Sequence, residues 1–281
     1  MNLVTTYDEI AIIQASMELS RRQIEILSGL SAGLSTTMVT HPLDLIKTRL
    51  QLSDEPSKNV LTKIRLQSGG LNKYYWGLVP NLVGNISAWG AYFTLYSEFK
   101  LILPQNNLTL NYFSSSFVAG ISTSLLTNPI WVLKTRIVGN SINHQSMIKL
   151  ARKIIENEGI RAFWKGCIPS LFLVFQASLQ FTFYDHGKVW LGSDLSTFQY
   201  LYLSATSKIL SMFIMYPTQV VKSRLQYAED KKTLFNTIKQ VWSQGALYNG
   251  LGASIIRVLP ATCITFVVYE LTKDLLTIGT I

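Results

Sequence analysis

One short motif occurs three times along the chain at almost equal intervals. It reads PLDLIKTR at residues 42–49, PIWVLKTR at residues 129–136 and PTQVVKSR at residues 217–224, which places its prolines 87 and 88 residues apart. A fixed period that divides a chain of 281 residues into three parts indicates three copies of one structural unit. We therefore expect a single domain over residues 1–281, built from repeats at about 22–104, 108–193 and 197–277, whose prolines meet around one axis.

Each repeat carries two apolar segments. The first ends at the motif proline and the second follows a basic, polar stretch, so that the six segments cover residues 24–40, 78–99, 112–128, 167–191, 198–216 and 251–275. Several approach the roughly 20 residues that a helix needs to cross a bilayer, and spanning helices tolerate proline where their neighbours satisfy the freed carbonyl. Only 15% of the residues are charged, against about 25% in soluble domains. The pattern predicts an all-α membrane protein with six transmembrane helices and three-fold pseudosymmetry.

The stretches that connect the apolar segments differ from them in pattern and charge. In residues 145–157, Ile148 and Ile154 alternate with basic residues such as Lys149, which is typical of a short amphipathic helix on a membrane surface. Residues 47–73, 134–165 and 222–239 together hold 18 of the 25 Lys and Arg but 6 of the 16 acidic residues. Such a bias marks loops that stay on the side of insertion and suits anionic lipid head groups. We therefore expect the three connecting segments on one side of the membrane and both termini on the other.

Other classes of protein share some of these features. A net charge of +9 also occurs in nucleic-acid-binding proteins, but here the charge lies between apolar runs and no nucleic-acid motif accompanies it. A soluble helical scaffold of three repeats that binds partners through a basic face stays open, and extraction by detergent but not by salt or carbonate would exclude it. The two cysteines, Cys167 and Cys263, and the histidines His41, His144 and His186 show no metal-ligand or nucleophile–base spacing. We expect no enzyme, no metal and no cofactor.

Three linked motifs resemble those of the mitochondrial carrier family, and the resemblance covers nearly the whole chain. The family repeats a Pro-x-acid-x-x-base-x-base motif, which is the repeat described above. Its acid-Gly…aromatic-base-Gly signature is matched by EGIRAFWKG at residues 158–166, whereas GGLNKYYWG in the first repeat lacks the acidic and basic residues and QGALYNG in the third is shorter. Its aromatic-acid-x-x-base motif is matched twice, by Tyr184/Asp185/Lys188 and Tyr269/Glu270/Lys273. The resemblance implies a transporter of the mitochondrial inner membrane, with both termini in the intermembrane space and short amphipathic helices in the matrix.

Within the family, the chain resembles the branch that moves nucleotides, dinucleotides and folate. Trp131 and Gln219 stand where the motif usually has an acid, and the stretches GLSAGLSTTMVTHPLDLIKTRLQL and IIRVLPATCITFVVYE are similar to those of fungal members that move FAD. The resemblance implies that FAD is the transported substrate rather than a cofactor. Folate, a pyrimidine nucleotide or NAD are alternative cargoes. The membrane partner that the resemblance implies is an anionic lipid, cardiolipin.

The resemblance also implies a gate at each face of the membrane. In the family, the acid of one odd-numbered helix pairs with the base of the next. On the matrix side this gives the pairs Asp44–Lys134, Trp131–Lys222 and Gln219–Lys47, with Gln51 as a brace beside them. On the cytoplasmic side it gives Asp185–Lys273, Glu270–Lys100 and Lys188 opposite the uncharged Ser97. Two ion pairs against one predict a firmer closed state on the cytoplasmic face. Alternatively, Asp44 only caps or solvates a helix end.

Two cations inside apolar segments, Lys208 and Arg257, suggest a substrate site. An intramembrane charge normally faces a cavity or a partner, and two cations suit a pyrophosphate. Arg257 follows Gly250 by seven residues, which is the place of the family's substrate contacts. The same count in the other repeats gives Gly84 with Asn85, and Leu173 with Val174. For Lys208 the alternative is a charge that snorkels to the interface.

Aromatic residues near these positions offer a surface for a flat ring. Trp89, Tyr92, Phe175 and Phe181 lie within a few helical turns of the predicted contacts. They could stack on the ring of a substrate, or they could face lipid or the protein core.

Overall fold

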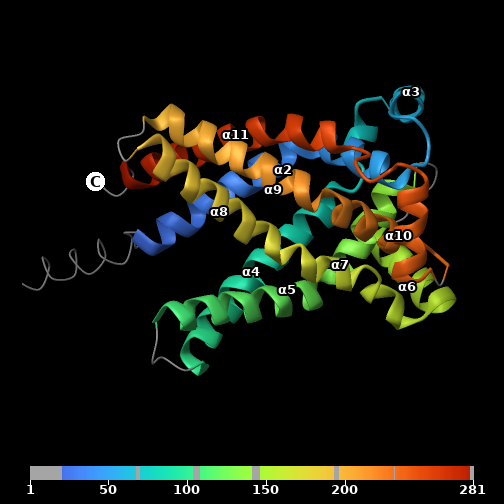
Figure 1. The fold of residues 1–281 in the computed structure, drawn as a ribbon, viewed down its shortest axis with the longest axis horizontal. Helices are drawn as coiled ribbons and strands as arrows, with labels where there is room; N and C mark the ends of the chain where they lie inside the picture. The colour runs from blue at the N-terminus through green and yellow to red at the C-terminus, as the bar shows by residue number, and fades with distance from the viewer. Residues whose placement is uncertain are drawn as a thin grey trace, which may run out of the picture. The chain divides into compact units, whose positions relative to one another are not determined.

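The computed structural model describes residues 21–67, 70–103, 108–140, 146–192, 196–230 and 232–278, and all the regular structure in these ranges is helical. Figure 1 shows the helices, which are α2 (Arg21–Leu52), α3 (Ser57–Leu66), η1 (Asn72–Tyr75), α4 (Leu78–Ile102), α5 (Leu108–Gly139), α6 (Met147–Glu158), η2 (Ile160–Trp164), α7 (Cys167–Phe172), α8 (Val174–Leu191), α9 (Thr197–Tyr227), α10 (Leu234–Ser243) and α11 (Leu251–Ile278). The all-α prediction is confirmed. Residues 104, 144, 145 and 193 and both chain ends, to which predictions also referred, lie outside the described ranges.

The chain divides into two compact units. One consists of residues 1–40 and 259–281, and the other of residues 41–258, so that α2 and α11 each contribute to both. In the second unit α4 lies along α5, α8 lies along α9, and α5 contacts α9. The short helices α3, α6 and α10 lie at one end of this unit (Figure 1). All the contacts described below for the repeated motifs are within the second unit.

The three motif helices continue through their prolines. α2 contains Pro42, α5 contains Pro129 and α9 contains Pro217, and the helices are 32, 32 and 31 residues long. This agrees with the expectation that each first apolar segment is extended by its motif, because a segment that stopped at the proline would be too short to span a bilayer.

Three stretches of the described chain are long and apolar enough to cross a membrane, namely Asn111–Gly139, Ile160–Leu191 and Leu251–Thr277. The helices α2 and α9 are of similar length but more polar. α2 carries Asp44 and Lys47 in its interior, and α9 carries Lys208 and Lys222. A helix with one face toward a polar cavity has this composition.

The second apolar segment of the middle repeat is not one helix. It was expected over residues 167–191, but the helix breaks at Leu173 between α7 and α8. The amide of Leu173 donates to the carbonyls of both Pro169 and Ser170 at 3.2 Å, and the amide of Gln176 donates back to the carbonyl of Leu173 at 3.1 Å. The bond to Pro169 is of the α-helical type, but the bonds from Leu173 to Ser170 and from Gln176 to Leu173 span only three residues, so the backbone is locally overwound.

Each short amphipathic helix packs on the motif helix that precedes it. α3 buries Val60 and Ile64 against Leu45 of α2. α6 buries Ile154 near Leu133 of α5, while Ile155 on its other face is exposed. A third cluster joins Val241 of α10 to Tyr216, Val220 and Val221 of α9. Three equivalent apolar contacts therefore hold the short helices α3, α6 and α10 against α2, α5 and α9.

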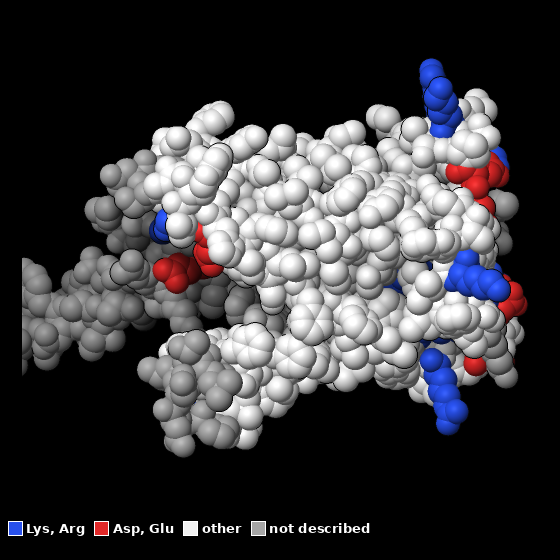
Figure 2. All heavy atoms as spheres, viewed as in Figure 1, with Lys and Arg blue, Asp and Glu red and all other residues white. Residues whose placement is uncertain are grey.

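Charged side chains on the visible face are concentrated near these short helices. Figure 2 shows most of the visible Lys, Arg, Asp and Glu where α3, α6 and α10 lie, a smaller group at the opposite end of the view, and uncharged residues between the two. A surface band without charges suits contact with lipid hydrocarbon, because an unpaired charge there is costly.

Candidate functional site

The residue before each motif proline makes the same hydrogen bond in every repeat. His41 Nε2 lies 3.1 Å from the carbonyl oxygen of Trp76, and since that oxygen can only accept, His41 donates. The equivalent bonds run from Asn128 Nδ2 to the Lys165 carbonyl at 3.1 Å and from the Tyr216 hydroxyl to the Asn249 carbonyl at 3.1 Å. The three acceptors each precede a glycine, and the glycines directly precede α4, α7 and α11. Three different side chains thus perform one structural task.

The glycines that follow, Gly77, Gly166 and Gly250, could not easily be replaced. Their φ angles are 83°, 74° and 85°, in the left-handed region that favours glycine. A Cβ atom on them would lie 2.5 Å from a side-chain atom of Val138, 3.0 Å from the Lys222 carbonyl and 2.9 Å from the Lys47 carbonyl, respectively. Each of α4, α7 and α11 therefore begins in close contact with a motif helix of another repeat, namely α5, α9 and α2, respectively.

The last arginine of each motif closes a ring among the three motif helices. Arg49 Nε donates to the carbonyl of Val138, Arg136 Nε to that of Gln226 and Arg224 Nε to that of Gln51, each at 3.0 Å. α2 is thereby linked to α5, α5 to α9, and α9 back to α2. We call the set Arg49, Arg136 and Arg224 the arginine ring.

Sequence reasoning gave the arginine ring no role beyond its basic charge. The signal was present in the spacing, because each arginine lies seven residues after its proline and each acceptor lies nine residues after the next one. All three arginines are at least nine-tenths buried. A buried guanidinium must be hydrogen-bonded, so three copies at equal spacing point to three equivalent acceptors.

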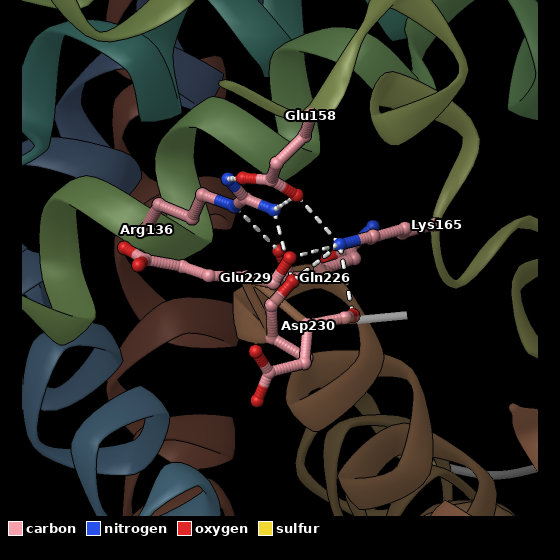
Figure 3. A network of polar contacts seen from close by, with 7 residues as sticks. Arg136, Glu158, Lys165, Gln226, Glu229 and Asp230 are labelled. Carbon is pink, nitrogen blue, oxygen red and sulfur yellow. Dashed lines mark hydrogen bonds and ion pairs between the residues drawn. The ribbon is translucent and has the colours of Figure 1, made fainter. Parts of the chain in front are cut away.

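In the middle repeat the ring arginine also holds a carboxylate (Figure 3). Arg136 donates to both carboxylate oxygens of Glu158, with Nη2 and Oε2 2.9 Å apart. Burial by itself would raise the pKa of Glu158, but hydrogen bonds from Arg136 and Lys165 outweigh it and hold the pKa below its ordinary value. This bidentate geometry is the strongest form of an arginine–carboxylate pair.

Lys165 extends this network to the end of α9. Its Nζ donates to Glu158 Oε2 at 2.6 Å. It also donates to three successive carbonyls that follow α9, those of Ala228, Glu229 and Asp230, at 2.8, 3.0 and 3.1 Å (Figure 3). The last carbonyls of a helix lack intrahelical partners and carry partial negative charge, so a lysine is well suited to bind them. The signature EGIRAFWKG thus ties α5 and α9 together.

At the level of the predicted matrix gate, the acid has a partner other than the expected one. Arg257 Nη1 lies 3.1 Å from Asp44 Oδ1, and Asn81 Nδ2 lies 3.5 Å from Asp44 Oδ2. No ion pair joins Asp44 to Lys134 in the described ranges. Asp44, a predicted gate residue, thus contacts Arg257, a predicted substrate-binding residue, so the predicted gate and the predicted substrate site are in direct contact.

Gln219 and Trp131 are the uncharged residues of the predicted matrix gate. Each lies close to the lysine that was expected to face it. Lys47 Nζ donates to Gln219 Oε1 at 3.0 Å. Lys222 lies over the ring of Trp131, with Nζ 6.0 Å from the ring centroid, and Lys134 lies 5.9 Å from the same centroid.

Gln219 and Gln51 have further polar contacts. Gln219 Nε2 donates to Gln176 Oε1 at 2.9 Å, and Gln51 Oε1 accepts a hydrogen bond from the Ser223 hydroxyl at 2.8 Å. Gln176, which sequence reasoning passed over, thereby joins the gate level.

The predicted substrate residues occupy contrasting places. Gly84 is buried, and a Cβ on it would lie 3.3 Å from the ring of Trp131. Asn85 is half-buried on the next position of α4, Leu173 lies at the helix break, and Val174 packs 3.4 Å from the Cβ position of Gly120 on α5.

Lys208 and the aromatic residues complete this description. Lys208 of α9 is half-buried and close enough to Arg257 for the two cations to interact electrostatically. Tyr92 is half-buried and stacks on Tyr96, with ring centroids 6.1 Å apart. The other three candidates, Trp89, Phe175 and Phe181, are exposed.

The predicted cytoplasmic pairs, Asp185–Lys273 and Glu270–Lys100, join residues of the two different units, and they stay predictions. Within each unit, three of the predicted lysines lie over tyrosine rings. Nζ of Lys100, Lys188 and Lys273 is 4.7, 5.8 and 5.7 Å from the ring centroids of Tyr112, Tyr200 and Tyr269, respectively. Such contacts attract a cation to the ring face, by about 0.5–1 kcal/mol at exposed sites.

Comparison with known proteins places these features in a family. A family model described as mitochondrial carrier protein matches residues 22–107, 105–195 and 193–279. A mitochondrial FAD carrier protein of Saccharomyces cerevisiae is 36% identical over 296 residues, which cover 88% of this chain and 95% of the relative. A chloroplastic folate transporter of Arabidopsis thaliana is 30% identical over 286 residues (86% and 92%), and a mitochondrial nicotinamide adenine dinucleotide transporter of S. cerevisiae is 29% identical over 288 residues (90% and 77%).

Proposed function

The chain belongs to the mitochondrial carrier family, and we propose that it moves FAD across the mitochondrial inner membrane by alternating access. It is a transporter and not an enzyme, and a carrier of this family needs no cofactor. Its relatives are carriers of nucleotide-like cofactors, which supports a small anionic substrate. We choose FAD over the other cargoes because, of the three relatives described above, the one named as an FAD carrier has the highest sequence identity to this chain.

The observation that carries the proposal is the contact between Arg257 and Asp44. Arg257 keeps about a third of its side chain exposed, and Lys208 is near enough to repel it. A pyrophosphate bound between these two cations would relieve that repulsion and offer the guanidinium more acceptor oxygens than one carboxylate does. Substrate phosphate would therefore compete with Asp44 for Arg257.

This competition provides a route from binding to gating. Once Asp44 is released from Arg257, it is available to Lys134, its expected partner in the matrix gate. Solvated ion pairs of this kind contribute roughly 0–1 kcal/mol each, so a substrate with a small preference for one arrangement can change which of two states is populated. Every 1.4 kcal/mol of such preference changes the ratio of the two states about tenfold.

The flat ring of the cargo would lie against the aromatic residues of α4 and α5. Gly84 leaves the ring of Trp131 without a side chain in front of it, and Tyr92 lies two helical turns further along α4. Gln176 and Gln219 offer amide groups that can bond to ring carbonyls and nitrogens.

The proposed orientation follows the charge. The arginine ring and the basic helices α3, α6 and α10 would lie on the matrix side, where cardiolipin supplies anionic head groups. Both termini would then be in the intermembrane space. Labelling of single cysteines introduced at residue 153 and near residue 25 should find them on opposite sides, and labelling from the same side would exclude this topology.

Uptake by liposomes that contain the purified protein tests the cargo. Labelled FAD, folate, NAD and a pyrimidine nucleotide are offered separately, with empty liposomes as the control. We expect saturable uptake that is fastest for FAD. Uptake of folate or a nucleotide without uptake of FAD would replace the proposed cargo and leave the family mechanism intact.

A further inference from the structure

The break at Leu173 changes which residue of α8 shares its side of the helix. Side chains three residues apart eclipse each other in a three-residue turn, whereas in a regular α-helix they lie about 60° apart around the axis. The amide of Gln176 donates to the carbonyl of Leu173 at 3.1 Å, which is a bond of this tighter kind. The overwound turn therefore brings Gln176 toward the side of Leu173, where the second repeat was expected to contact the cargo.

Gln176 gives the second repeat a polar group that its expected cargo contacts lack. Leu173 and Val174 are apolar, and Gln176 is half-buried. In the other two repeats the corresponding helices, α4 and α11, are each continuous over their described lengths. The overwound turn is thus a feature of the middle repeat, and its effect is to add an amide where the sequence placed only hydrocarbon.

Gln176 is the last member of a chain of hydrogen bonds whose direction is fixed by a lysine. Lys47 Nζ donates to Gln219 Oε1 at 3.0 Å, and Gln219 Nε2 donates to Gln176 Oε1 at 2.9 Å. An ammonium group has donors and no acceptor, so the amide of Gln219 must turn its oxygen toward Lys47 and its nitrogen toward Gln176. Within the described ranges, no acceptor of the protein binds Gln176 Nε2. The chain therefore ends in two N–H donors.

This chain of hydrogen bonds joins all three repeats beside the proposed cargo site. Lys47 belongs to α2, Gln219 to α9 and Gln176 to α8. Lys47 is also close enough to Arg257 and Asp44 to interact with both electrostatically. Because hydrogen bonds in a chain polarise one another, the charge of Lys47 makes the terminal N–H groups of Gln176 stronger donors.

We propose that Gln176 is the residue of the second repeat that selects the cargo, by donating a hydrogen bond from Nε2 to a carbonyl oxygen of the cargo's ring. The inference rests on the proposed function, since the flavin ring of FAD carries two such carbonyls. A ring without an acceptor at this place would leave the donors of Gln176 unpaired, which lowers affinity. A bound carbonyl would also hold Gln219 on Lys47, so recognition of the ring is connected to the matrix gate.

Thio analogues of FAD test this hydrogen bond. In these analogues sulfur, a weak acceptor, replaces one or the other ring carbonyl oxygen, while the sugar and the phosphates are unchanged. Binding of FAD to the purified full-length protein is followed by the fluorescence polarisation of the flavin, and each analogue is measured by competition with FAD. We expect the wild type to bind one of the analogues about three- to tenfold more weakly than FAD.

Gln176→Met is the decisive variant, because methionine has nearly the length of glutamine but no N–H donor. It should bind FAD about as weakly as the wild type binds that analogue, and it should distinguish little between the two ligands. A loss of affinity caused only by the larger size of sulfur would persist in this variant. Gln240→Met on α10, where Gln240 accepts a hydrogen bond from Lys232 at 3.4 Å, is the matched control and should keep the wild-type preference.

Lys47→Met tests the direction of the chain. Without the ammonium group the amide of Gln219 can turn over, and Gln176 can then present its oxygen in place of its nitrogen. The preference for FAD over the thio analogue should therefore fall, whereas a merely structural defect would weaken the binding of both ligands equally.

The inference is overturned if the wild type binds FAD and both analogues equally, or if Gln176→Met distinguishes them as strongly as the wild type does. Either result leaves FAD as the cargo. A wild type that does not bind FAD overturns the proposed cargo instead. The wild type and Gln176→Met are then compared with the cargo that liposome uptake identifies, and equal affinity for that cargo overturns the inference as well.

Discussion

The repeated motif has two functional positions, five residues apart on each of α2, α5 and α9. The three repeats are alike at one position and differ at the other. At the arginine ring the three repeats are alike, since each arginine donates to a backbone carbonyl of the next motif helix at 3.0 Å. Two residues after the prolines they differ, since the chain has Asp44, Trp131 and Gln219 there. The first level acts on backbone atoms, which every residue type supplies, and the second acts through side chains.

This difference indicates that the arginine ring supports the fold, whereas the residues two positions after the prolines can determine selectivity for the cargo. The acceptors of the arginine ring are the backbone carbonyls of Gln51, Val138 and Gln226, and the apolar Val138 serves as well as the two glutamines. The ring can therefore stay intact while the sequence around it changes. At the other level a substitution changes the charge, polarity or shape of a side chain in the predicted gate, so cargo and gating can be adjusted there without loss of the fold.

The largest expected effect is on the arginine ring. Arg136→Ala removes the buried partner of the bidentate pair with Glu158 and the bonds to two carbonyls of the α9 end, and leaves a half-buried carboxylate with one cation. We expect a loss of about 3–5 kcal/mol in the free energy of unfolding, as for other broken buried pairs. Denaturant unfolding in detergent measures it, with Arg152→Ala on the exposed face of α6 as the control. Equal stability of the two variants would mean that the ring does not support the fold.

The next effect concerns pH. The pKa of Glu158 in the folded protein lies below its ordinary value of 4.5. Its contribution to stability is therefore fully present above pH 4.5 and is lost as the pH falls through the folded pKa. Glu158→Gln should be less stable than the wild type by about 1–3 kcal/mol at pH 7, and the difference should shrink below pH 4.5. A stability difference that stays constant from pH 7 to pH 3 would contradict this assignment.

A smaller effect is expected at the gate level, where the contact between Arg257 and Asp44 is 3.1 Å long and the Arg257 side chain is 31% exposed. Two double-mutant cycles, one for Asp44 with Lys134 and one for Asp44 with Arg257, compare the two partners by transport. Each coupling should be about 1 kcal/mol, and the exchange Asp44→Lys with Lys134→Asp should restore part of the activity that each single change removes. If the effects of Asp44 and Lys134 are strictly additive, these residues do not meet during transport, and the gate must be reassigned.

Much of the architecture was predictable because it depends on local pattern. The period of 87 and 88 residues indicated three repeats, and the alternation of Ile154 with basic neighbours indicated α6, which the structure has at Met147–Glu158. The proximity of Lys47 and Gln219 followed from the family resemblance. The break at Leu173 was not predictable, because no residue that usually ends a helix stands there.

The pairing of Asp44 with Arg257 shows the limit of such prediction for the site. The two residues are 213 positions apart, and Asp44 has three Lys or Arg side chains near it, Arg257, Lys134 and Lys47. Which base it contacts depends on the conformational state, which composition and spacing do not encode. The buried Nη2 of Arg49, which has no hydrogen-bond partner, was equally hidden, although Gly69 stands where the signature of the second repeat has Glu158.

The most direct test of the proposed site is the binding of FAD by the purified protein, followed by the fluorescence polarisation of the flavin. Wild type, Arg257→Ala and Arg257→Lys are compared at low and high salt, with the exposed Lys153→Ala as the control. We expect Arg257→Ala to bind at least about tenfold more weakly, as for the loss of a charged hydrogen bond, and Arg257→Lys to recover part of the affinity. If Arg257→Ala binds FAD as tightly as the wild type at both salt concentrations, Arg257 does not hold the phosphates and the proposed site is wrong.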